Sequence, residues 1–196
     1  MNWLAHLFLS EPTIEDRFGN LLADLVKGTN RQKLSPRFNK GIKCHLLIDS
    51  FTDRHLIVKR SKNRIDTDYK RYSGVLVDII YDRILARNWQ RYSQVSLSEF
   101  TEEIYTSFKD NLDDIPMPTR KNIERMIDEK LLDSYYYMSG VEKALIRIKQ
   151  RLSSKHSNLF IVSNAMKQLE NNYEGLEEDF NIFFPEIIDY LKTQKY

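Results

Sequence analysis

Apolar residues recur every three or four positions along most of the chain, which is the spacing of α-helices that bury one face. Only NLFIV, residues 158–162, is strand-like, and it could equally be the buried end of a helix. We therefore predict an all-α fold, a compact bundle of about seven or eight helices in a single domain, residues 1–196. The predicted helices cover residues 13–28, 35–53, 72–89, 96–108, 119–138, 139–152 and a last stretch from 176 onward.

Capping signals place several of these helix starts. Thr13 stands before two acidic residues, as a helix N-cap does. Ser96 with Glu99 and Ser139 with Glu142 both fit the capping-box pattern. Pro118 is expected to start the helix over 119–138, and Pro185 to bend or restart the last helix.

The composition indicates a folded, water-soluble protein. Hydrophobic residues make up 41% and charged residues 30% of the 196, as in globular domains. The single cysteine, Cys44, excludes an internal disulfide and fits a reducing cytoplasm. The apolar start, MNWLAHLFL, is too short to span a bilayer and lacks the basic residues of a signal peptide. We expect a cytoplasmic protein without a membrane partner.

Carboxylates interrupt the most apolar predicted helix, residues 72–89. Apolar side chains cover almost its whole circumference, which indicates a buried helix. Asp78 and Asp82 lie four residues apart on it and would repel one another. Burying two unpaired carboxylates costs several kcal/mol each, so the pair needs a positive partner.

Histidine and aspartate recur in apolar settings on three other predicted helices. His6 lies within WLAHLFL and Asp24 within NLLADLV, while His45 and Asp49 are one helical turn apart. A divalent cation bound by oxygen and imidazole would account for all of these residues together with the Asp78/Asp82 pair.

Simpler interpretations remain open for each residue. A lone histidine such as His6 is commonly a hydrogen-bonded core residue, and His45 with Asp49 could be a surface pair. Arg83 or Lys27 could neutralise one of the two carboxylates on helix 72–89.

Charge is unevenly distributed along the chain. Residues 25–65 contain eleven lysines and arginines but only two acids, Asp49 and Asp53, whereas residues 170–191 contain seven acids and no base. A basic rim around an acidic centre suits a phosphorylated or strongly acidic substrate, although a basic run can also be a solvated face. Nucleic acid is not the expected partner, because the basic stretch lacks interleaved aromatic residues and any known binding motif.

Five segments in order resemble the acyl carrier protein phosphodiesterase family: MNWLAHLFL, GNLLADLVKG, GIKCHLLIDSFTDRH, YSGVLVDIIYDRILARNW and FFPEI. The resemblance implies a helical, HD-like fold, distantly similar to metal-dependent phosphohydrolases of the HD type. It also implies an enzyme that hydrolyses holo acyl carrier protein to the apo form and 4′-phosphopantetheine. The expected cofactor is Mn²⁺ or Mg²⁺, and the expected partner is the acidic carrier protein.

The resemblance and the residue pattern select the same candidate site. The expected metal ligands are His6, Asp24, His45, Asp49, Asp78 and Asp82. The candidate bases are Asp24, Asp53 and Asp82, and the candidate substrate-binding residues are Lys27, Arg83, Lys59 and Lys62. In the family, histidine is common where this chain has Phe8 and Arg83, and arginine is common where it has Leu46. Arg83 could therefore bind phosphate or mark a lost histidine.

Two other functions remain open. One is a metal phosphohydrolase that acts on a nucleotide or another small phosphoester. The other is a non-catalytic paralogue that binds acyl carrier protein with a decayed site.

Overall fold

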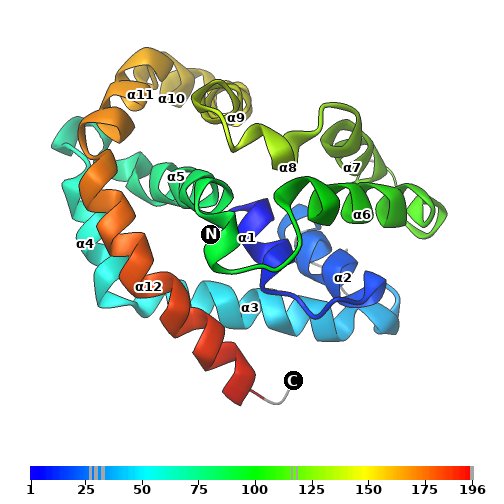
Figure 1. The fold of residues 1–196 in the computed structure, drawn as a ribbon. Helices are drawn as coiled ribbons and strands as arrows, with labels where there is room; N and C mark the ends of the chain where they lie inside the picture. Colours follow the sequence, from blue (N-terminus) through cyan, green and yellow to red (C-terminus); the bar gives the residue numbers. More distant parts are fainter. Residues whose placement is uncertain (27, 29–30, 32–33, 116, 118, 195–196) are drawn as a thin grey trace.

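The structure, a computed structural model, describes residues 1–26, 28, 31, 34–115, 117 and 119–194, leaving out the side chains of 154–156. Over these residues the chain forms twelve α-helices with short 3₁₀ segments between them and no strand, which confirms the all-α class and corrects the expected number of helices (Figure 1). The helices are α1 (Trp3–Phe8), α2 (Ile14–Leu25), α3 (Asn39–Arg54), α4 (Leu56–Arg64), α5 (Ser73–Arg87), α6 (Leu97–Lys109), α7 (Thr119–Asp128), α8 (Leu131–Ser134), α9 (Met138–Arg151), α10 (Ser154–Leu159), α11 (Val162–Asn171) and α12 (Tyr173–Thr193).

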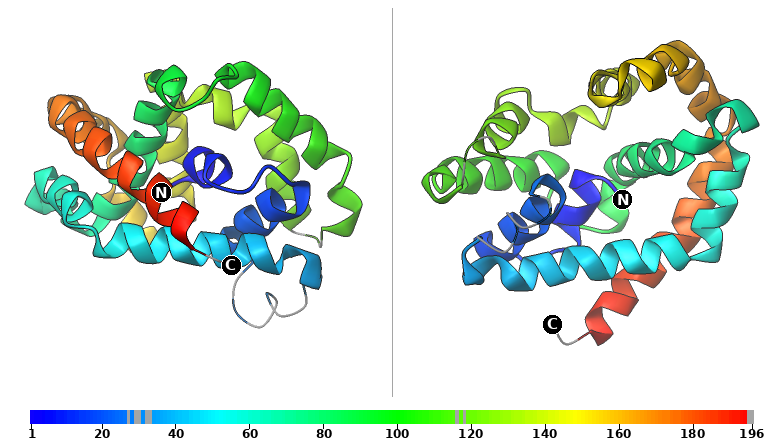
Figure 2. Two further views of the ribbon diagram at one scale, coloured as in Figure 1. Left: turned by 60° about the horizontal axis from the view of Figure 1, so that its bottom comes forward. Right: turned by 180° about the vertical axis from the view of Figure 1, so that it is seen from behind.

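The short helix α1 lies at the centre of the fold. It packs between α2 and α5, and the longer helices surround it in all three views (Figures 1 and 2). α2 packs closely along α3, α12 contacts α3, α4 and α5, and α9 contacts α5 and α11. Residues Trp3 to Leu7 are buried, which explains the apolar start of the chain as a core helix. None of the described helices is long and apolar enough to cross a membrane.

The two carboxylates of α5 hold the N-terminal end of α1. Asp82 is fully buried, and its two oxygens accept the backbone N–H groups of Leu4 at 2.8 Å and Ala5 at 3.1 Å. Asp78 forms an ion pair of 2.9 Å with the ammonium group of Met1. The first N–H groups of a helix lack partners within the helix and carry partial positive charge. The N–H groups of Leu4 and Ala5 and the ammonium group of Met1 are thus the positive partners that the two carboxylates need in their apolar surroundings.

A pair of glycines brings α2 and α3 together. A Cβ added to Gly41 would lie 2.0 Å from the carbonyl oxygen of Asp16, and one added to Gly19 would lie 2.3 Å from that of Phe38. Both distances are far below contact distance, so only glycine permits this backbone approach. The close packing fixes how α2 and α3 present their polar side chains to α1.

The acidic C-terminal helix packs on the basic helix α4. Asp179 of α12 is fully buried and accepts hydrogen bonds from Arg60 at 2.7 Å, Arg64 at 2.9 Å and Ser61 at 2.7 Å. Burial raises the pKa of this carboxylate, but the bonds from Arg64, Ser61 and Arg60 outweigh burial and lower its pKa overall. The basic and acidic segments of the sequence are thus partly neutralised by a contact between these two helices.

Several predicted boundaries are confirmed. Thr13 accepts the backbone N–H of Asp16, and Ser96 and Glu99 form a complete capping box. The strand-like run 158–162 contains the end of α10 and the start of α11. A restart of the last helix at Pro185 is not found, because α12 is one continuous helix through that residue. Pro118 lies outside the described residues.

Two other predicted boundaries are wrong. The predicted helix over 119–138 is broken after Asp128, and Lys130 adopts a left-handed conformation (φ 45°) before α8 begins. Ser139 caps no helix, because α9 already begins at Met138 and its N-cap, Tyr137, makes no side-chain capping bond. Local signals did not reveal that the chain turns here.

We predict that Asp82 makes the folded protein less stable as the pH rises. Burial raises its pKa from 3.8 to about 7, although the bonds from Leu4 and Ala5 oppose this shift. Below pH 4 the carboxyl is neutral whether the chain is folded or unfolded; between pH 4 and 7 the folded state binds the extra proton. The contribution of Asp82 to the free energy of unfolding is therefore greatest at acid pH and falls through this range.

Asp82→Asn should remove this dependence. The free energy of unfolding is measured in urea at pH 5 and pH 8 for both proteins. Between these pH values it should fall by about 2 kcal/mol more in the parent than in the variant. Parallel pH profiles would show that Asp82 stays ionised in the fold.

Candidate functional site

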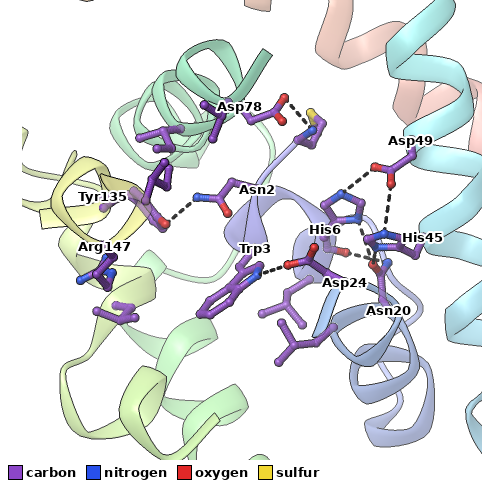
Figure 3. A pocket seen from close by; sticks show the side chains of 18 of the residues that line it. Asn2, Trp3, His6, Asn20, Asp24, His45, Asp49, Asp78, Tyr135 and Arg147 are labelled. Carbon is purple, nitrogen blue, oxygen red and sulfur yellow. Dashed lines mark hydrogen bonds and ion pairs between the residues drawn. The ribbon is translucent and has the colours of Figure 1, made fainter. Parts of the chain in front are cut away.

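A pocket of about 300 Å³ opens between two walls that meet around α1 (Figure 3). One wall comes from α1, α2 and α3 and contains His6, Asn20, Asp24, His45 and Asp49. The other comes from α5 and the segment that includes α8 and α9, and it combines apolar side chains with polar ones. The pocket therefore brings together all four helices on which the sequence indicates histidine or aspartate in apolar surroundings.

Two histidines and one aspartate meet on the first wall. Nε2 of His6 lies 3.3 Å from Oδ1 of Asp49, and Nε2 of His45 lies 3.0 Å from Oδ2 of the same carboxylate. The two imidazole rings stack with their centroids 4.4 Å apart. His45 and Asp49 can converge because residues four apart share one face of a helix. His6 reaches them because α1 is held in the centre of the fold.

Asn20, which the sequence analysis did not select, fixes both histidines. Its side-chain oxygen lies 2.9 Å from Nδ1 of His6 and 3.1 Å from Nδ1 of His45 (Figure 3). Its side-chain nitrogen donates to the carbonyl oxygen of His6 at 3.2 Å and to the hydroxyl of Ser10 at 2.8 Å. A signal was present in the sequence, because Asn20 lies one helical turn before Asp24 in an apolar segment.

The orientation of Asn20 sets the protonation of both rings. Its oxygen can only accept, so Nδ1 of each histidine must carry the proton. Burial lowers the pKa of His6 and favours its neutral form, in which Nε2 has a lone pair and no proton. In the neutral tautomers the Nε2 atoms of His6 and His45 present lone pairs to Asp49. Such a cluster favours a proton or a cation among its donor atoms.

The three aspartates of the pocket differ in their partners. Asp24 accepts the indole N–H of Trp3 at 2.9 Å, and Asp78 is paired with the ammonium of Met1. Burial alone would raise the pKa of Asp49, but the hydrogen bonds that His45 and His6 donate to it when their rings are protonated hold it well below its usual range. All three can therefore present carboxylate oxygens to the pocket. Among the described residues, however, no group of three or more His, Cys, Asp or Glu side chains is arranged so that it could hold a metal ion.

Not all predicted site residues reach the pocket. The oxygens of Asp82 face the backbone of α1, and Asp82 does not line the pocket. Asp53 is 74% exposed and pairs with Lys62 at 3.3 Å, one turn beyond the pocket on α3. The ligand role expected for Asp82 and the catalytic roles expected for Asp53 and Asp82 remain predictions without support from these positions.

The predicted substrate-binding cations also lie away from the pocket. Arg83 donates to the carbonyl oxygen of Tyr136 at 2.5 Å and lies over the ring of Tyr173. Lys59 and Lys62 are on α4 and do not line the pocket. Lys27 lies outside the described residues.

Comparisons with known proteins agree on one family. A model of the family described as acyl carrier protein phosphodiesterase matches residues 1–187. An acyl carrier protein phosphodiesterase of Yersinia enterocolitica is 28% identical over 186 residues, 94% of each chain. Proteins of the same name from Serratia proteamaculans and an Enterobacter species are 28% and 29% identical over 197 residues, covering all of each chain. No solved structure matches the chain significantly.

We predict that His6 and His45 carry their protons on Nδ1 when no metal is bound. Long-range ¹H–¹⁵N NMR spectra should show this tautomer for both rings above their pKa values, because each Nδ1 donates to Asn20. In Asn20→Ala the rings should shift to the Nε2-protonated form, in which they can donate to Asp49.

His55 is the internal control for these spectra. Its Nδ1 accepts the backbone N–H of Ile57 at 3.3 Å, and its Nε2 lies 2.9 Å from Glu186. It should therefore show the opposite tautomer in both proteins. Protonation of Nε2 in His6 or His45 of the neutral parent would contradict the role given to Asn20.

Proposed function

Because the chain belongs to the acyl carrier protein phosphodiesterase family, we propose that it is a metal-dependent phosphodiesterase that hydrolyses holo acyl carrier protein to the apo form and 4′-phosphopantetheine. The observation that carries this proposal is the cluster of His6, His45 and Asp49 in a pocket with two further carboxylates. Imidazole and carboxylate groups gathered in one pocket are the donors that phosphodiester hydrolysis at a metal requires.

We infer a divalent cation from the types of donor in the pocket, although no described group of three is already arranged around one. Asn20 directs the unprotonated Nε2 atoms of His6 and His45 toward Asp49, and a cation would relieve the contact between these lone pairs and the carboxylate. Asp78, in the same pocket, would add a carboxylate oxygen by turning from Met1. Oxygen-rich ligation favours Mn²⁺ or Mg²⁺ over zinc. Such an ion, when bound, lowers the pKa of a water molecule and polarises the phosphodiester.

The protein's own side chains orient the reacting groups and provide a general base. Trp3 holds one carboxylate oxygen of Asp24 and so orients the other, which makes Asp24 our choice of general base among the predicted candidates. Asn20 keeps both histidines in one tautomer by accepting from each Nδ1. The negative charge of Asp49 would offset the positive charge of a bound cation or of a protonated histidine beside it.

The positions at which this chain departs from the family pattern do not reach the pocket. Phe8 packs in an aromatic cluster with Trp89, Phe100 and Phe184. Arg83 lies on the outer side of α5 against Tyr136, and Leu46 is 50% exposed. Loss of histidines at positions 8 and 83 therefore removes no group from the wall that carries His6 and His45. This placement favours an enzyme over a decayed binding paralogue.

The basic face of α3 and α4 is our proposed docking surface for the acidic carrier protein. Lys59 is exposed on α4, and Lys62 is partly exposed beside Asp53. Arg60 and Arg64 are less available, because both bind the buried Asp179. Opposite charge on the two proteins would speed their association more than it would tighten the complex.

Cleavage of holo acyl carrier protein tests the proposed function. Protein stripped with a chelator should be inactive, and Mn²⁺ should restore release of 4′-phosphopantetheine as followed by mass spectrometry. Asp49→Asn should lower kcat/KM roughly 100-fold or more, because Asp49 touches both histidines. Asp189→Asn, an exposed carboxylate on α12, is the charge-matched control and should leave activity unchanged.

A substrate panel separates the alternatives. Faster turnover of nucleotides or p-nitrophenyl phosphate esters than of holo carrier protein would favour the small-phosphoester hydrolase. Tight binding of holo carrier protein without cleavage, in the presence of Mn²⁺ or Mg²⁺, would favour the non-catalytic paralogue.

Charge reversal tests the docking surface. Lys59→Glu combined with Lys62→Glu should lower kcat/KM for holo carrier protein several-fold at low salt, because opposite charges steer association. The difference should shrink as salt is added. Hydrolysis of a small phosphodiester should be unchanged, since that substrate does not touch α4. Equal slowing of both substrates would contradict the docking surface.

A further inference from the structure

The pocket wall opposite the histidines contains cations that the sequence analysis did not select. Arg147 of α9 lines the pocket and is 15% exposed (Figure 3). Arg151 also lines the pocket, one helical turn further along the same face of α9. Ala144 and Ile148, on the same helix, supply apolar contacts beside them. The wall from α9 is therefore positively charged, whereas the wall with Asp24 and Asp49 is negatively charged.

Arg147 makes one ion pair with an exposed carboxylate and a hydrogen bond to the hydroxyl of Tyr135. Its nearest acidic partner, Glu129, lies 3.4 Å away and is 47% exposed. Pairs of this kind contribute little to stability, and a guanidinium group has five N–H donors. Most of the donor capacity of Arg147 therefore remains for a ligand in the pocket.

Tyr135 supplies a second donor beside Arg147. Its side chain is buried, and its oxygen accepts a hydrogen bond from Asn2 at 2.6 Å (Figure 3). Burial raises the pKa of the phenol, so the hydroxyl keeps its proton at neutral pH. Because Asn2 occupies a lone pair of the oxygen, the proton can be donated to a ligand.

An anionic substrate needs such a wall. Three carboxylates, Asp24, Asp49 and Asp78, line the rest of the pocket and would repel a phosphate group. An arginine with its planar set of donors binds phosphate oxygens in a bidentate manner, and a neutral phenol adds a donor without adding charge.

We propose that Arg147 and Tyr135 form the subsite that binds the phosphate oxygens of the substrate, with Arg151 at its outer edge. The subsite holds the phosphate against the carboxylate wall, and the apolar side chains of Val75, Ile79 and Ile148 contact the uncharged arm. That the bound phosphodiester is holo acyl carrier protein rests on the proposed function. That the subsite binds a phosphate group is independent of it.

Binding without catalysis tests the subsite directly. 4′-Phosphopantetheine is titrated into chelator-treated protein, and the fluorescence of Trp3, which lines the pocket, reports binding. Arg147→Met should raise Kd at least about tenfold, and Tyr135→Phe about threefold. Lys143→Met, an exposed cation on the same helix, removes the same charge and should leave Kd within about twofold of the parent. Equal affinity of the parent and Arg147→Met, or no binding by the parent, would overturn the proposal.

Glu129→Gln separates ligand binding from a purely structural role. If Arg147 acts only through its pair with Glu129, this variant should weaken binding as much as Arg147→Met does. We expect unchanged or tighter binding, since the guanidinium loses a competitor. If Arg147→Met does not fold, as judged by circular dichroism, Arg147→Lys should still raise Kd about threefold, because an ammonium cannot bind phosphate bidentately. An Arg147→Lys affinity equal to that of the parent would then overturn the proposal.

Kinetics distinguish this inference from the proposed function. With holo carrier protein, Arg147→Met should lower kcat/KM about 100-fold. If the parent binds 4′-phosphopantetheine through Arg147 but cleaves no holo carrier protein, the proposed function fails and the subsite stands. If the parent cleaves it and Arg147→Met is as active, the subsite fails and the function stands.

Discussion

The hydrogen bonds from the start of α1 to Asp82 are the contacts on which the site depends. A short helix of six residues has little stability of its own, and this one is buried on nearly all sides. Its free N–H groups would be costly to bury without acceptors. Asp82 supplies two acceptor oxygens from within the most apolar helix of the fold. The helix is thereby fixed at the depth and rotation at which His6 faces α3.

Asn20 orients the two histidines that this placement brings together. One side-chain amide, held by the backbone of α1 and by Ser10, contacts both histidines and determines which nitrogen of each carries the proton. Asp49 faces the two remaining nitrogens. The arrangement requires α2 and α3 to lie very close together, which Gly19 and Gly41 permit. A buried network of this kind is strongly ordered because each member has several partners.

Charge is arranged differently in space than along the chain. The basic segment predicted as a rim divides into residues that bind the buried Asp179 and residues that remain at the surface. The cations that line the pocket, Arg147 and Arg151, come instead from a helix far along the sequence. The negative and positive walls of the pocket are therefore contributed by opposite halves of the chain.

The helical class, the approximate bounds of α2, α3, α5, α6 and α9, and five polar residues of the pocket could be predicted from the sequence alone. Periodicity and capping depend on neighbours within a few residues, so they can be read locally. His6, Asp24, His45 and Asp49 stood out because polar groups in apolar surroundings need partners. The identity of those partners follows from the packing of the helices and could not be predicted. In the folded chain Asp82 binds the backbone of α1, and Arg83 lies outside the pocket. Asn20, Tyr135 and Arg147 line the pocket instead. Contacts between residues more than a hundred positions apart, such as Asn2 with Tyr135, leave no local pattern, because they arise from how the helices pack.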